Sequence, residues 1–147
     1  AFADRLVETA DSFNVDHNMV ILEITESVAM NDIDKVKIQF NKLREKGFII
    51  SIDDFGSGYS SLGILSEIEF DEIKLDRALI VNAVASESSR ILLCGIVSMI
   101  HSLNRRIVCE GVEELAQVEL LQSIGCYNVQ GYFYSKPVSQ QDFNERL

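Results

Sequence analysis

Short apolar runs alternate with helical patterns along the whole chain, and this alternation restricts the possible folds most strongly. Each run has the length and composition of a buried strand, and the segments between the runs carry apolar residues at helical spacing. Strands are expected at residues 20–24, 48–52, 72–76, 106–109 and 128–134. Helices are expected at residues 2–13, 33–43, 60–66, 88–103, 115–121 and after Ser139. This order favours a parallel α/β sheet with right-handed crossovers.

Two architectures fit this order of elements: an open doubly wound sheet and part of a (β/α)₈ barrel. The chain has 147 residues, of which 47% are hydrophobic and 24% are charged, so one packed domain is expected. No apolar stretch approaches the roughly 18 residues that a membrane span needs. A signal peptide is not expected either.

The net charge of −10 disfavours general binding to DNA, other nucleic acids or anionic lipid, because phosphate groups would be repelled. A bound cation would reverse this effect locally. The three cysteines have no metal-like spacing, and their odd number is typical of reduced thiols in a cytoplasmic protein.

Polar residues fall at or near the carboxyl end of every expected strand. Because ligands bind at this edge in both architectures, we expect these side chains to converge. Carboxylates that lie so close repel one another unless they share cations, and hard oxygen ligands select Mg²⁺, Mn²⁺ or Ca²⁺. The residues at these strand ends are Glu23, Asp53, Asp54, Lys74, Asp76, Glu110 and Gln130.

The adjacent pair Asp53 and Asp54 needs a special backbone, since neighbours on a regular strand point to opposite faces. Both can reach one site only if the strand ends there and the chain turns. Gly56 and Gly58 supply the freedom for this turn. The pair is therefore predicted to form a metal-bridging corner.

Each of these residues also has a simpler interpretation. A single strand-end glutamate is commonly a solvated loop residue, Lys74 could only neutralise Asp76, and Glu26 could be a surface or capping residue. Five successive strand ends with such residues favour a shared site.

The segments LEITES, IDDFGSGYSSL, IKLDR, VCEGVE and QGYFYSKPV occur in the order and at the spacing of the EAL domain. The chain resembles this family over essentially its whole length. The family hydrolyses the bacterial second messenger cyclic di-GMP to linear pGpG. The resemblance thus implies a signalling phosphodiesterase with two Mg²⁺ or Mn²⁺ ions in each complete site.

The resemblance also implies a role for each matching residue. Glu23 and Glu110 correspond to metal ligands, Asp53 to the aspartate that bridges two metals, and Asp54 to a ligand that also acts on the attacking water. Lys74 corresponds to the lysine that contacts that water or the scissile phosphate. Gln130 corresponds to a glutamine that orders the water and metal shell. Further substrate-binding or site-supporting positions are Glu26, Asp76 and Glu113.

The family fold is a (β/α)₈ barrel, which needs about 250 residues. Residues 1–147 therefore resemble the C-terminal portion of one EAL domain, without the first barrel strands and the E-A-L motif. On its own this portion is expected to have little or no activity. It is also expected to form a homodimer, or to exchange segments, so that its open sheet edges are covered. Domains upstream, including a membrane tether, remain compatible with this interpretation.

Two other functions stay open. Some EAL-like domains bind cyclic di-GMP or a protein partner without cleaving the nucleotide. A phosphoacceptor receiver domain also combines five β-α units with an acidic pair. A receiver carries that pair after its first strand, however, whereas here a complete β-α unit precedes Asp53.

Overall fold

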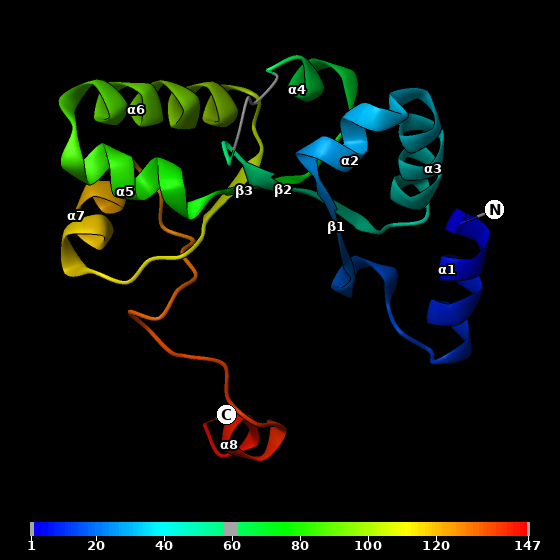
Figure 1. The fold of residues 1–147 in the computed structure, drawn as a ribbon. Coiled ribbons are helices and arrows are strands. Elements are labelled where there is room, and N and C mark those ends of the chain that lie inside the picture. The colour runs from blue at the N-terminus through cyan, green and yellow to red at the C-terminus, as the bar shows by residue number, and fades with distance from the viewer. Residues whose placement is uncertain (1, 58–61, 147) are drawn as a thin grey trace.

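Four parallel strands form one sheet in the order β1-β2-β3-β4. The computed structural model describes residues 2–57 and 62–146, apart from the side chains of Glu26 and Met30. The sheet lies at the centre of the molecule, with helices along one side of it (Figure 1). This arrangement confirms the α/β class expected from the sequence. The strands are β1 (Ile21–Thr25), β2 (Ile49–Phe55), β3 (Glu72–Leu75) and β4 (Arg106–Cys109).

Helical segments connect the successive strands, which is what a parallel sheet requires. The short helix expected at residues 60–66 is α4, and its first expected residues lie outside the described part of the chain. Two α-helices, α2 and α5, and the short 3₁₀ helix η1 were not expected from the sequence. The helices are α1 (Phe2–Ser12), η1 (His17–Met19), α2 (Glu26–Asn31), α3 (Ile33–Glu45), α4 (Gly63–Glu67), α5 (Arg77–Ala85), α6 (Glu87–Ser102), α7 (Leu115–Ser123) and α8 (Gln140–Asn144).

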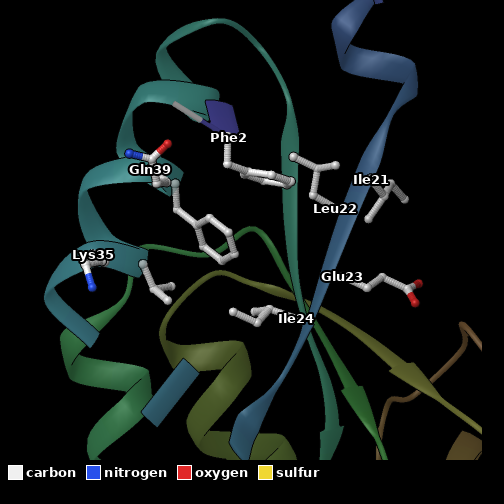
Figure 2. A pocket seen from close by; sticks show the side chains of 9 residues that line it. Phe2, Ile21, Leu22, Glu23, Ile24, Lys35 and Gln39 are labelled. Carbon is white, nitrogen blue, oxygen red and sulfur yellow. The ribbon is translucent and has the colours of Figure 1, made fainter. Parts of the chain in front are cut away.

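The two faces of the sheet differ in chemistry because successive strand residues point to opposite sides. One face is apolar and packs into the core with the helices; Ile50, Ile52 and Ile73 on it are fully buried. Figure 2 shows the same alternation on β1, where Leu22 and Ile24 face the helices and Glu23 points to the other side. The other face carries the polar residues of the strands, among them Glu23, Ser51, Asp53, Glu72 and Lys74.

The fifth expected strand, at residues 128–134, is reduced to one bridge between Val129 and Cys109. Gln130 N donates to Cys109 O at 2.9 Å, and the chain then turns, with Tyr134 N donating to Gly131 O at 3.1 Å. A side chain at Gly131 would meet the Val112 backbone, because a Cβ there would lie 2.0 Å from Val112 O. The chain therefore turns at Gly131, where it packs closely on Val112, and its pairing with β4 ends there. Beyond it the chain leaves the sheet and runs to α8 (Figure 1).

At the amino end of the sheet, acidic side chains are paired with arginines. Glu72 is buried, accepts a hydrogen bond from Ser51 Oγ at 3.1 Å and lies 2.6 Å from Arg106 Nε. Asp71 lies 2.9 Å from Arg44 Nη2 and accepts the backbone N–H of Ile50. Burial would raise the pKa of Asp71, but the hydrogen bonds from Arg44 and Ile50 outweigh burial and lower the pKa.

Candidate metal centre

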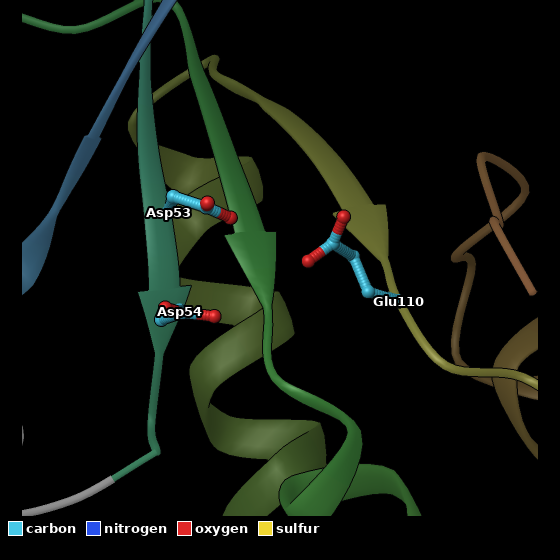
Figure 3. A group of neighbouring side chains, drawn as sticks. All are labelled: Asp53, Asp54 and Glu110. Atoms are coloured by element: carbon cyan, nitrogen blue, oxygen red, sulfur yellow. The ribbon is translucent and has the colours of Figure 1, made fainter.

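Three carboxylates converge at the carboxyl end of the sheet. Asp53, Asp54 and Glu110 each offer one oxygen, and these oxygens all lie within 4.8 Å of one another. Asp53 and Asp54 come from the end of β2, whereas Glu110 directly follows β4. Figure 3 shows Asp53 and Asp54 on one side of β3 and Glu110 on the other, with their carboxylates turned toward each other. The sequence prediction that these residues converge is therefore supported by their geometry.

The aspartate pair reaches the site through a distortion within β2, and the expected end of the strand before the pair is wrong. The strand continues to Phe55, and its pairing with β3 shifts register between Ile52 and Phe55. Asp54 itself adopts a left-handed conformation with φ of 56°. Such irregularities redirect side chains, which explains how neighbouring residues serve one site. Gly56 follows with φ of 92°, and Gly58 lies outside the described residues.

Lys74 lies among carboxylates from three strands or their ends. Its Nζ atom is 2.8 Å from Glu110 Oε1, 2.9 Å from Glu23 Oε1 and 3.2 Å from Asp53 Oδ1. The residue is only 8% exposed. Burial of the ammonium would lower the pKa of Lys74, but the contacts with Glu110, Glu23 and Asp53 outweigh burial and raise it. Lys74 is therefore a fixed positive charge at this edge.

The donor set suits a hard divalent cation. Oδ1 of Asp53 is buried and accepts no hydrogen bond from the residues that the structure describes, although Lys74 lies nearby. Burial raises the pKa of Asp54, and the charges of Asp53 and Asp76 raise it further. A buried oxygen that has an ion pair but accepts no hydrogen bond, and carboxylates that repel one another, both favour a cation, and all-oxygen ligands suit Mg²⁺, Mn²⁺ or Ca²⁺.

Two of the expected site residues are less closely placed. Glu23 contacts Lys74, but its half-exposed side chain is not part of the group of three carboxylates. The Gln130 side chain is exposed, and among the described residues it has no hydrogen bond to the three carboxylates. The backbone of Gln130 is nevertheless fixed beside the site, since its carbonyl accepts from Val112 N at 3.1 Å.

The three residues expected to support the site are Asp76, Glu113 and Glu26, and each has a different position in the structure. Asp76 caps α5, where its Oδ1 accepts the backbone N–H of Ala78 at 2.9 Å. Glu113 lies 2.6 Å from Nη2 of Arg77. The prediction for Glu26 concerns a side chain outside the described part of the structure.

Arg77 borders the site as well, although no strand-end pattern in the sequence marks it. Besides pairing with Glu113, it packs against Gly111, where an added Cβ would lie 2.6 Å from Arg77 Cβ. Arg77 thereby connects the chain after β3 to the loop that follows Glu110. The only signal in the sequence was its place in the segment IKLDR, directly after Asp76.

Comparison with protein families matches residues 1–137 to the EAL domain. The chain belongs to the EAL domain family. Among curated EAL relatives, the bifunctional diguanylate cyclase/cyclic di-GMP phosphodiesterase MucR of Pseudomonas aeruginosa is 41% identical over 119 residues. This match covers 81% of the chain and 17% of MucR.

Solved EAL structures share the fold. The EAL domain of Mycobacterium smegmatis DcpA has a TM-score of 0.91 and 29% identity, covering 99% of this chain and 65% of that one. The manganese/cyclic di-GMP complex of Klebsiella pneumoniae BlrP1 at pH 6 has a TM-score of 0.85 and 30% identity. That match covers 91% of this chain and 34% of BlrP1. This chain therefore spans only part of the length of these structures.

Proposed function

We propose that this chain carries the carboxylate and lysine half of a cyclic di-GMP phosphodiesterase site, which hydrolyses the nucleotide to linear pGpG. The observation that carries the proposal is the convergence of Asp53, Asp54 and Glu110 beside the buried Lys74. The resemblance of the whole chain to EAL proteins supports the substrate class.

In this proposal, Asp53, Asp54 and Glu110 hold two Mg²⁺ or Mn²⁺ ions, with Glu23 as a further ligand. Bound divalent ions would lower the pKa of a water molecule and neutralise phosphate charge. Lys74 binds a phosphate oxygen and adds positive charge where negative charge develops. Asp54 accepts a proton from the attacking water, a role that suits a carboxylate with a raised pKa.

The remaining residues are proposed to orient the attacking water and to support the loops around the site. Gln130 is positioned by the hydrogen bonds between its backbone and residues Cys109 and Val112, and its amide is proposed to orient the water. Glu113, through its pair with Arg77, and Asp76, through its cap of α5, support the loops that border the site. Glu26 is proposed to support the loop that follows Asp54.

We also propose that residues 1–147 are the C-terminal portion of one EAL domain and that the missing strands supply the remaining ligand. The match to 65% of the DcpA EAL domain chain supports this assignment. Alone, this chain is expected to cleave cyclic di-GMP weakly or not at all. Cleavage with Mn²⁺ is to be compared between this chain and a version extended upstream to a whole domain. Equal rates would contradict the assignment.

A non-catalytic receptor for cyclic di-GMP, or a protein-interaction module, is the alternative. It is favoured by the exposure of the Gln130 side chain, which leaves the proposed water-orienting amide in contact with solvent. Calorimetric titration with cyclic di-GMP, together with an assay for pGpG in the extended version, distinguishes the two. Binding without cleavage in a complete site supports the receptor and contradicts the phosphodiesterase.

We further propose that two copies associate, or exchange segments, to cover β1, which stands at one end of the strand order. Beside β1 lies a largely apolar pocket of about 540 Å³, lined by residues that include Phe2, Leu22 and Phe40 (Figure 2). An unpaired strand edge beside apolar side chains favours association. Light scattering at micromolar concentration is expected to give the mass of a dimer, and a monomeric mass would contradict this proposal.

No helix among the described residues is long and apolar enough to cross a membrane. We infer a cytoplasmic location from the three cysteines, which are unpaired in the structure. Labelling of all three thiols in protein taken from cells under denaturing, non-reducing conditions tests this inference. Disulfide-linked protein in that experiment would contradict it.

A further inference from the structure

We propose that Lys74 acts as an internal substitute for the metal cation. In the metal-free protein its ammonium group holds the carboxylates together, and cation binding releases it toward the phosphate of the substrate. This inference rests on the proposed phosphodiesterase site and concerns what happens there before substrate arrives.

The contacts of Lys74 overlap with the candidate metal ligands. Its Nζ atom lies 3.2 Å from Asp53 Oδ1 and 2.8 Å from Glu110 Oε1, and both residues belong to the group of three carboxylates. A cation at that group would therefore compete with the ammonium for the same two side chains. Glu23, at 2.9 Å from Nζ, is the partner that lies outside the group.

The excess of negative charge at this edge favours a divalent cation over the Lys74 ammonium. Four carboxylates, Glu23, Asp53, Asp54 and Glu110, surround one ammonium group, so most of their negative charge is not compensated by it. A divalent cation supplies more positive charge than Lys74 and is repelled by it at close range. Binding of the cation should thus weaken the contacts of Lys74 with Asp53 and Glu110.

Burial limits where the released side chain can go. Lys74 is 8% exposed and projects from β3, one of the two inner strands, on the polar face of the sheet. Of its three partners, the Glu23 side chain is the most exposed, at 46%, against 21% for Asp53 and 22% for Glu110. A shift toward the open side of the site, where the exposed Glu23 lies, would present the ammonium to an incoming phosphate. The cation would therefore bind first and make Lys74 available to the substrate.

Removal of the lysine charge tests the competition directly. Lys74→Met keeps most of the side-chain volume, and it should raise the affinity for Mn²⁺ about tenfold, measured by calorimetry at mildly alkaline pH. It should also lower the thermal stability of the metal-free chain, because the carboxylates lose their internal cation. Lys74→Arg keeps the charge and should not bind Mn²⁺ more tightly than the native chain.

Lys46→Met is the matched control, since it makes the same change in net charge on an exposed residue at the end of α3. Its Mn²⁺ affinity should equal that of the native chain. An equal rise in both methionine variants would overturn the proposal, because the effect would then come from net charge alone. Unchanged or weaker binding by a folded Lys74→Met variant would also overturn it.

A second measurement needs no variant that might fail to fold. The Cε resonance of Lys74 in the native chain should shift saturably with Mg²⁺, with the dissociation constant that calorimetry gives for the same ion. No shift at saturating Mg²⁺ would overturn the proposal while leaving the metal site in place. Absence of any Mg²⁺ or Mn²⁺ binding by the version extended upstream to a whole domain would instead overturn the proposed site and, with it, this inference.

Discussion

The two ends of the sheet handle negative charge in opposite ways. At the amino end, each of three acidic residues has an arginine partner: Glu72 pairs with Arg106, Asp71 with Arg44 and Glu69 with Arg105. At the carboxyl end, Lys74 alone contacts three carboxylates, and Asp54 adds a fourth. Both ends therefore place acidic side chains beside basic ones, but only the amino end has one arginine for each acid.

This difference separates a structural role from a binding role. Paired charges at the amino end satisfy one another, so they can fix the start of the strands without any ligand. Uncompensated carboxylates at the carboxyl end repel each other, and only a cation or bound protons relieve them. Loss of a charge at the amino end should therefore lower stability, whereas loss of a carboxylate at the carboxyl end should weaken binding and catalysis without lowering stability.

The largest expected effect is the loss of the site in Asp53→Asn. In a complete domain, this variant should lose cyclic di-GMP cleavage by about a hundredfold or more, because a ligand to the divalent cations is removed. Its Mn²⁺ binding should be lost as well, while its unfolding in urea should change little. Asp34→Asn, on an exposed residue in the first turn of α3, is the control and should retain activity. Normal cleavage by Asp53→Asn would contradict the assignment of the metal site to the carboxyl end of the sheet.

The next effect is a loss of stability in Arg106→Met. This change leaves the buried carboxylate of Glu72 with Ser51 as its remaining partner, which should cost about 2 kcal/mol of unfolding free energy, measured in urea. Mn²⁺ affinity should not change. Arg90→Met removes a surface pair with Glu87 and should cost less than about 0.5 kcal/mol. If the two variants are equally stable, the arginines of the amino end do not hold the fold.

The smallest effect is a difference in how the two ends respond to acid. The pKa of Asp71 in the folded chain is lowered from 3.8, so its contribution to stability is present above that value and is lost as the pH falls below it. The pKa of Asp54 is raised from 3.8, so this residue destabilises the metal-free chain as the pH rises above that value. In urea unfolding at neutral pH, Asp71→Asn should therefore lower stability and Asp54→Asn should raise it. Shifts of the same sign in both variants would contradict the comparison.

The sequence predicted the position of the site better than its detail. Residues such as Asp53 and Glu110 were found because the apolar runs before them mark strand ends, and the carboxyl ends of parallel strands share an edge. The left-handed backbone at Asp54 and the register shift beside it had no signal in the pattern, since most residues with such a backbone are glycine. The sequence therefore predicted that Gly56 and Gly58 make the turn after the aspartate pair, and it gave no indication of the unusual backbone at Asp54.

Other features were missed for equally local reasons. The α5 segment ALIVNAVA is almost entirely apolar, so it lacks the alternation of faces that marks a surface helix. The run at residues 128–134 has strand-like residues, but its close packing at Gly131 on Val112 is a tertiary contact. The arginine partners of Glu72 and Asp71 are likewise far away in sequence. Periodicity reports burial along one element and does not report which elements meet.

A calorimetric titration of Mn²⁺ into the native chain, Asp53→Asn and Arg106→Met tests the central claim most directly. Mn²⁺ is expected to bind the native chain and Arg106→Met with the same affinity, and not to bind Asp53→Asn. Binding to Asp53→Asn with the native affinity, or loss of binding in a folded Arg106→Met variant, would show that the cation site is not at the carboxyl end of the sheet.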